Sequence, residues 1–189
     1  MLEALPQKDR PLWATGFYSG LRPGELQALR VSDVNIEERE IRVERTWDRV
    51  EGPVAPKTPK SRRTVAMLAD LRPYLVQHLL ASGRRGDDLV FGRTATIPFL
   101  PHAVRERAYR AWDAAGLERF TLHETRHTLA SILFDADVNV RAISDEVGHS
   151  KTSITMDVYA HLYKGSRDEL RRKADEYLRR QAEGQMVGK

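Results

Sequence analysis

Residues 20–26 read GLRPGEL and place the end of one helix beside the start of another. The apolar run before them, PLWATGFY at 11–18, predicts a buried helix that ends at Gly20. Pro23 predicts the first turn of a second, short helix, because proline is favoured there and an acidic residue such as Glu25 suits the positive end of a helix. The stretch therefore predicts two consecutive helices joined by a tight loop.

Arg22 stands at the N-cap of that second helix, where unpaired backbone N–H groups already favour an anion. A guanidinium at this position adds a planar fork that suits phosphate oxygens. A solvated helix start, with Arg22 paired to Glu25, explains the same residues without any ligand.

The pattern changes after residue 36. Ile41 and Val43 alternate with charged residues, which is the period of a strand, and Gly52-Pro53 breaks the run. A second short strand is expected at 63–66, after an exposed turn. We therefore expect an α+β, predominantly helical fold with a small antiparallel sheet or hairpin near residues 36–66. Further helices are expected at about 70–81, 100–115, 122–135, 139–147, 152–161 and 166–182.

Composition excludes several classes of protein. The 189 residues contain no cysteine, which rules out a disulfide scaffold, thiol catalysis and a zinc site with cysteine ligands. No apolar run reaches the ~18–20 residues of a membrane span, and no signal peptide is visible, so we expect a cytoplasmic protein without membrane contact. The formal net charge of +4 permits an anionic partner.

Residues 57–63 read KTPKSRR, with four basic side chains and no acid. On a hairpin tip, such a segment can follow a nucleic-acid backbone. An ordinary soluble turn between two strands is the alternative. The basic residues are Lys57, Lys60, Arg62 and Arg63.

Residues 121–127 read TLHETRH and allow two interpretations. His-Glu-x-x-His is the zincin pattern, with Glu124 as general base and, downstream, Glu146 as an imaginable third ligand. Alternatively, Thr121 and Glu124 form a capping box, which places His123 in the first turn beside Arg126, both facing an anion.

Two further segments carry candidate residues. Gly148 predicts the end of a helix, which leaves His149 in a tight turn, and Tyr159 falls two turns into the next helix. Taken singly, a capping histidine and a half-buried aromatic residue are adequate explanations.

Together, the ordered motifs resemble the catalytic domain of the tyrosine recombinases, the phage integrase family. The matching stretches are GLRPGEL at 20–26, PKTPKSRRTV at 56–65, LHETRHTLAS at 122–131, VGHSKTS at 147–153 and YAHL at 159–162. The resemblance implies a tyrosine-recombinase-like fold over residues 1–189, with the N-terminal DNA-binding domain of the family absent.

The resemblance also implies the site. Tyr159 corresponds to the nucleophile, and Glu25 to the acidic residue that supports the first catalytic arginine. The remaining catalytic residues would be Arg22, Lys57, His123, Arg126 and His149. Lys60, Arg62 and Arg63 are expected to bind DNA phosphates.

The implied activity is site-specific cleavage and rejoining of double-stranded DNA through a 3′-phosphotyrosyl intermediate, without metal, cofactor or ATP. The protein is expected to form a homo-oligomer, a tetramer, on DNA and to be a monomer without it, in the nucleoid of a bacterial or phage-host cell. The basic helix expected near the C-terminus could pack on its own domain or on a neighbouring protomer. A zinc hydrolase and a non-catalytic DNA-binding module are the alternative functions.

Overall fold

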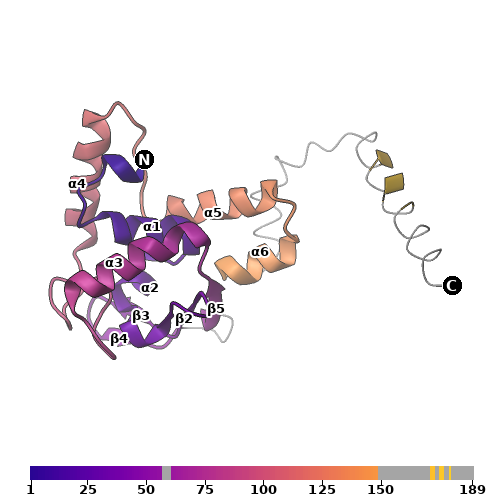
Figure 1. Cartoon of the computed structure of the whole chain (residues 1–189). Coiled ribbons are helices and arrows are strands. Elements are labelled where there is room, and N and C mark those ends of the chain that lie inside the picture. Colours follow the sequence, from indigo (N-terminus) through magenta and orange to yellow (C-terminus); the bar gives the residue numbers. More distant parts are fainter. Residues whose placement is uncertain (57–60, 149–170, 173–174, 177–178, 180–189) are drawn as a thin grey trace. The chain divides into compact units, whose positions relative to one another are not determined.

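A computed structural model of the chain describes residues 1–56, 61–148, 171–172, 175–176 and 179 (Figure 1). The chain divides into two compact units, Met1–Thr155 and Met156–Lys189. In the second unit the described residues are helical, and Arg172 lies 3.6 Å from the Glu176 carboxylate. The helix expected at 152–161 lies outside the described residues.

The first two predicted helices are confirmed. Helix α1 spans Arg10–Ser19 and ends at Gly20, which takes a left-handed conformation with φ 62°. Helix α2 spans Pro23–Ala28, with Pro23 in its first turn. A Cβ at position 20 would lie 2.9 Å from the Leu129 side chain, so both the left-handed backbone and the close contact require glycine here.

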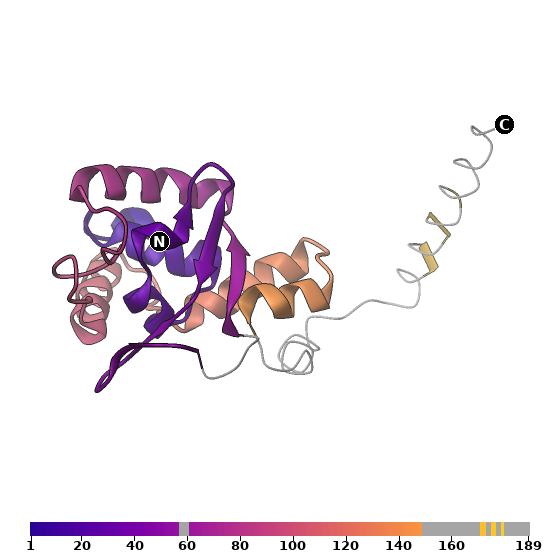
Figure 2. The same cartoon turned by 90° about the horizontal axis from the view of Figure 1, so that it is seen from below.

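The predicted antiparallel sheet is also confirmed. It has three strands in the order β1-β2-β5, where β1 is Val34–Asn35, β2 is Glu40–Val43 and β5 is Arg63–Ala66. Strand β5 pairs with β2 so that Ile41 faces Val65 and Val43 faces Arg63. Figure 2 shows these two strands side by side.

The expectation that Gly52-Pro53 interrupts the strands is wrong. These residues begin β4, Gly52–Val54, which pairs with β3, Thr46–Asp48, in a separate two-stranded hairpin. Proline is tolerated because each strand of such a hairpin is an edge strand, where a missing N–H can face away from the partner.

The remaining helices lie within a few residues of their predicted positions. They are α3 (Arg72–Ser82), α4 (Pro101–Ala114), α5 (Glu124–Asp135) and α6 (Val140–Val147). Short 3₁₀ turns occur at Leu2–Ala4, Val31–Asp33 and Ala69–Leu71. No described helix has the length and apolar character needed to cross a membrane.

The core lies among α1, α2, α3, α4 and the three-stranded sheet. Trp13 of α1 and Trp112 of α4 meet edge to face, with ring centroids 4.8 Å apart. Helix α5 packs against α1, and α6 packs against both α5 and β5. This packing carries the start of α5 and the end of α6 to the loop between α1 and α2.

Candidate active site

Arg22 lies at the N-cap of α2 with an extended backbone, φ −68° and ψ 155°. Its guanidinium donates to a side chain and to a backbone carbonyl. Nη1 donates to Glu25 Oε1 at 2.8 Å, and Nη2 donates to the carbonyl of Gly148 at 2.6 Å. About a third of the side chain stays exposed, so the guanidinium is held on one side and open on the other.

The carboxylate of Glu25 lies between Arg22 and Arg63 and accepts hydrogen bonds from both. It is 4% exposed and accepts four hydrogen bonds. The backbone N–H of Arg22 donates to Oε2 at 2.8 Å, and Arg63 donates to both oxygens, each at 3.0 Å. The contact between Glu25 and Arg22 that the sequence analysis expected is therefore present, within a larger cluster than the sequence indicated.

Two opposing effects set the pKa of Glu25. Burial alone would raise it, but the hydrogen bonds and positive charges of Arg63 and Arg22 outweigh burial and hold the pKa below its ordinary value. Glu25 is consequently ionised at neutral pH and serves as a fixed negative charge between two cations.

Arg63, which the sequence predicts to bind DNA phosphates, lies in this cluster. Its side chain is only 7% exposed, because the strand β5 directs it inward to Glu25. Its Nε donates to the carbonyl of Glu146 at 2.9 Å, near the end of α6. All three guanidinium nitrogens thus have protein partners. Its neighbour Arg62 is exposed, as expected.

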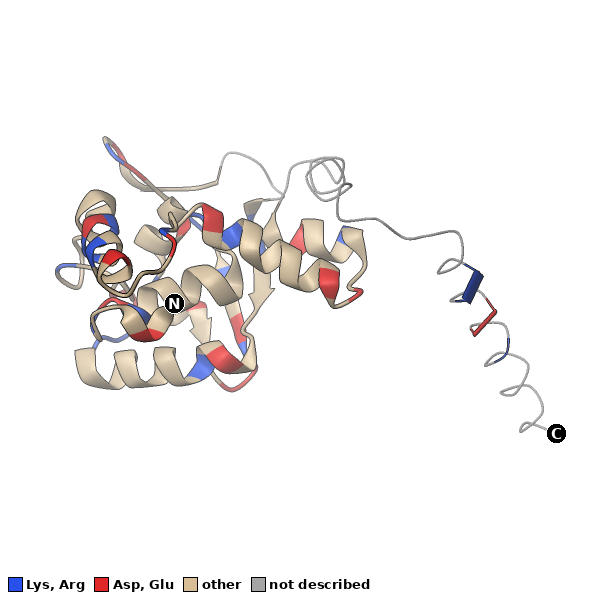
Figure 3. Cartoon of the chain, turned by 90° about the horizontal axis from the view of Figure 1, so that it is seen from above, with Lys and Arg blue, Asp and Glu red and all other residues tan. Residues whose placement is uncertain are grey.

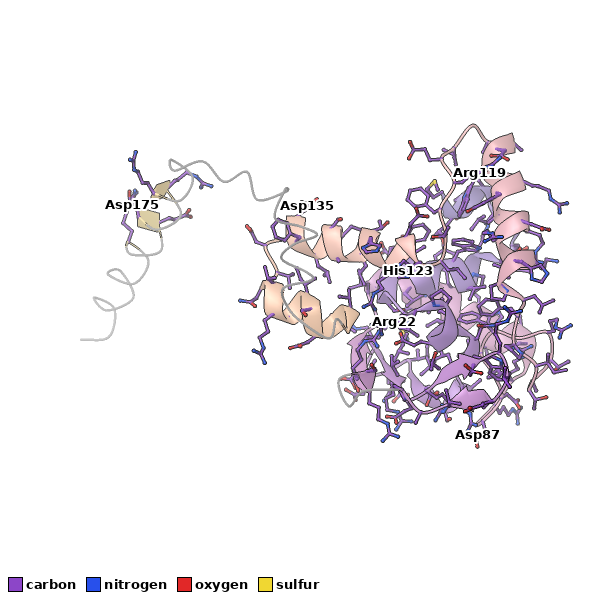
Figure 4. The ribbon with its side chains drawn as sticks, turned by 180° about the vertical axis from the view of Figure 1, so that it is seen from behind. Arg22, Asp87, Arg119, His123, Asp135 and Asp175 are labelled. Carbon is purple, nitrogen blue, oxygen red and sulfur yellow. The ribbon has the colours of Figure 1, made fainter. Side chains whose placement is uncertain are left out.

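The start of α5 brings the second arginine to the same loop. Arg126 is 3% exposed, and its Nη1 donates to the carbonyl of Gly20 at 3.2 Å. His123 directly precedes the helix and is exposed. In Figure 4 the labelled Arg22 and His123 mark these two segments, which are a hundred residues apart in the sequence.

The reciprocal hydrogen bonds predicted between Thr121 and Glu124 are present, but α5 begins at Glu124, so His123 lies at the N-cap and not in the first turn. The Thr121 N–H donates to the Glu124 carboxylate at 2.7 Å, and the Glu124 N–H donates to Thr121 Oγ1 at 3.2 Å. The bond from the Thr121 N–H, and after it a hydrogen bond from the Thr121 side chain to the carboxylate, lower the pKa of Glu124. A carboxylate used in this way is poorly placed to be the general base of a zinc hydrolase.

The other groups of the zincin interpretation do not converge. The rings of His123 and His127 are in contact, with centroids 5.2 Å apart. Glu146, however, accepts from the Ala66 N–H at 2.7 Å and so faces β5. In the part of the chain that the structure describes, no group of three or more His, Cys, Asp or Glu is arranged to hold a metal ion.

The remaining predicted site residues, Lys57, Lys60, His149 and Tyr159, lie outside the described residues. The structure does describe Gly148, which precedes His149 and ends α6 with φ 66°. Its carbonyl accepts from Arg22, so the backbone that leads to His149 begins at the arginine cluster.

Basic and acidic residues occur together along the chain around the site. Lys and Arg are interspersed with Asp and Glu over the described residues of the first unit (Figure 3). Arg22, Arg63 and Glu25 together carry two positive charges and one negative charge. The site therefore has a local excess of positive charge that suits an anion.

Comparison with known proteins gives a consistent assignment. The family model described as "Phage integrase family" matches residues 3–166. A "Tyrosine recombinase XerC-like" protein of Caldanaerobacter subterraneus is 29% identical over 177 residues, which cover 81% of this chain and 45% of that protein. "Prophage integrase IntR" of Escherichia coli is 29% identical over 182 residues, covering 84% and 44%. The chain thus spans less than half the length of these relatives.

Solved structures share the fold. The Tn1549 transposon integrase, in complex with transposon right end DNA, superposes with a TM-score of 0.74 at 21% identity, covering 90% of this chain and 59% of that one. XerA recombinase gives a TM-score of 0.68 at 23% identity, covering 93% and 61%. The predicted α+β, helix-rich fold is therefore confirmed.

Proposed function

The chain belongs to the phage integrase family, and from this premise we propose that it catalyses site-specific cleavage and rejoining of double-stranded DNA. One observation carries the proposal. Arg22, Arg126 and the end of α6 come from three distant parts of the sequence and meet at the loop between α1 and α2. The two guanidinium groups are held there by hydrogen bonds to backbone carbonyls, and together they can bind the phosphate of a phosphodiester.

The proposed reaction starts with Tyr159. Its Oη attacks the phosphorus atom and forms a 3′-phosphotyrosyl bond, while the bond to the 5′-oxygen breaks. A phenol has an ordinary pKa of ~10, so His123 accepts the proton that the hydroxyl loses. Lys57 donates a proton to the departing 5′-oxygen.

Arg22 and Arg126 stabilise the charge that develops on the non-bridging oxygens, and His149 donates a further hydrogen bond. Both arginines are restrained before the substrate arrives, which lowers the cost of organising the site. Because the phosphotyrosyl bond conserves the energy of the broken linkage, attack by a second 5′-hydroxyl rejoins the strands. The reaction as proposed needs neither ATP nor a metal ion.

The same proposal covers the organisation of the protein. Residues 1–189 form one catalytic domain that acts on DNA in the nucleoid, as a tetramer on DNA and a monomer without it. Exposed Arg62, together with Lys60, binds phosphates along the duplex.

Trapping of a covalent adduct tests the function. A labelled pool of nicked suicide duplexes, randomised around the nick, releases a short strand on cleavage and leaves the protein attached to DNA. We expect an adduct that resists denaturant, persists after exhaustive chelation and is lost in Tyr159→Phe, whose DNA affinity should be unchanged. Binding without any adduct would favour the non-catalytic module, and an adduct or hydrolysis that requires zinc would favour the hydrolase.

A further inference from the structure

We propose that Arg63 is a positioning residue that keeps the charge of Arg22 available for the DNA phosphate, and that it does not bind DNA itself. This inference rests on the proposed function for its catalytic readout. Its structural basis is the buried cluster of Arg63, Glu25 and Arg22.

Arg63 changes the charge balance around Glu25. Glu25 paired with Arg22 alone would neutralise the one guanidinium that remains partly exposed. Arg63 supplies a second positive charge on the buried side of the carboxylate, so the three groups retain one net positive charge. That charge is carried at the open side of the cluster, by Arg22.

Arg63 also restricts the geometry around Glu25. Arg63 occupies both oxygens of Glu25, so each oxygen has room for only one further donor from Arg22, the Nη1 on Oε1 and the backbone N–H on Oε2. Without Arg63, the Arg22 fork would be free to swing onto both oxygens, since a bidentate arrangement is the strongest for this pair. The guanidinium would then leave its contact with the Gly148 carbonyl.

Arg63 is also linked to α6. Its Nε donates to the Glu146 carbonyl, and the Glu146 side chain accepts from the Ala66 N–H on the same strand. Strand β5 thereby holds the last turn of α6 at two points, just before Gly148. Arg63 connects the strand, the carboxylate and the turn that Arg22 contacts.

The experiment compares Arg63→Met with Arg62→Met, its exposed neighbour. In single-turnover adduct formation on the nicked duplex pool, Arg63→Met should be slower by about 10²-fold, the cost of a small misplacement of a catalytic group. Its dissociation constant for duplex DNA should rise, and its salt slope fall by about one, only because Arg22 no longer offers its charge to a phosphate. Arg62→Met should weaken binding and reduce the salt slope by a similar amount directly, whatever residue stands at position 22.

Two further variants separate positioning from a general loss of folding. Arg63→Lys keeps the charge and should recover part of the rate. In a protein that already carries Arg22→Lys, Arg63→Met should slow adduct formation by far less than it does alone, because both changes act through the same group. Equal slowing in both backgrounds, or an equal loss of DNA affinity in both, would overturn the proposal, because a direct DNA ligand acts independently of position 22.

A probe without chemistry distinguishes this inference from the proposed function. Inorganic phosphate is titrated into the full chain while the Nε–H signals of its arginines are followed by NMR. We expect the Arg22 signal to respond in the parent protein and to respond much less in Arg63→Met, whether or not an adduct forms. An identical response in the two proteins would contradict the positioning role.

Discussion

Arg63 and Glu25 form a bidentate ion pair in which both terminal nitrogens of the arginine donate to the two carboxylate oxygens, each at 3.0 Å. The side chains are 7% and 4% exposed, so water screens the pair very little. The pair joins β5 to α2 across 38 residues of sequence. Because the pair is buried, removal of either side chain should destabilise the fold, since the other charge is then buried without a counter-charge.

Glu25→Gln should lower the free energy of unfolding by about 3 kcal/mol, because it leaves two guanidinium groups facing each other without a buried counter-charge. Urea denaturation measures this change. Asp113→Asn is the matched control, since Asp113 and Arg119 form a fork of the same type with about half of each side chain exposed. The control should change stability much less, because solvent screens an exposed pair. Equal losses in both variants would show that burial of the pair does not matter.

The contribution of Glu25 should depend on pH. Its pKa in the folded protein lies below the ordinary value of 4.5, because the hydrogen bonds and charges of Arg63 and Arg22 overcome the effect of burial. A carboxyl group with a lowered pKa adds stability above its unfolded pKa and loses that contribution as pH falls through its folded pKa. The stability difference between the parent protein and Glu25→Gln should therefore be full at neutral pH and shrink below pH 4.5.

Glu146 provides the opposite case for the same denaturation series. Burial raises its pKa, outweighing the Ala66 N–H and the charge of Arg63. Its ionised form therefore costs stability at neutral pH, and this cost disappears as pH falls through the folded pKa. Glu146→Gln should therefore have a higher free energy of unfolding than the parent protein at neutral pH, and this difference should disappear in acid. If Glu25→Gln and Glu146→Gln differed from the parent protein in stability with the same sign at neutral pH, these pKa assignments would be contradicted.

Gly148→Ala should be more destabilising than Gly116→Ala. Both glycines have φ 66°, so the backbone strain of an alanine, about 1–2 kcal/mol, is the same. A Cβ at 148 would lie 3.0 Å from the Arg63 guanidinium, whereas a Cβ at 116 would meet nothing within 4 Å. The difference between the two variants in urea denaturation measures the contact, and Gly148→Ala should also slow adduct formation. Indistinguishable stabilities would mean that the guanidinium moves aside freely.

Lys57→Ala tests the proposed general acid. Replacing the bridging 5′-oxygen of the DNA by sulfur makes a thiolate the leaving group, and a thiol of pKa ~8.5 needs no proton from the enzyme. Lys57→Ala should therefore cleave the sulfur-bridged DNA nearly as well as the parent protein and fail on ordinary DNA. Arg22→Ala and Arg126→Ala should stay impaired on both substrates, because the charge they offset lies on the non-bridging oxygens. Rescue of all three variants, or of none, would leave Lys57 as a cation that only binds the backbone.

Local chemistry explains which elements could be predicted from sequence. Gly20 and Gly148 end helices because a left-handed residue is needed there, and Pro23 begins one because its φ suits a first turn. The cap between Thr121 and Glu124 also spans only three residues. The β3–β4 hairpin was missed because Gly52-Pro53 is a turn signal in most settings, and only its edge position makes it a strand.

Within the part of the chain that the structure describes, the sequence by itself determined helices α1 to α6 and strands β2 and β5. It also identified Arg22, Glu25, His123 and Arg126 as candidate site residues, because the signals of each motif lie within a few positions of one another. Only the tertiary structure decided the role of Arg63. In sequence it is one of four basic residues in a row of seven, all alike as candidate phosphate ligands. Pairing of β5 with β2 and packing of α6 on β5 turn its side chain to the buried carboxylate, and such long-range contacts leave no trace in a local window.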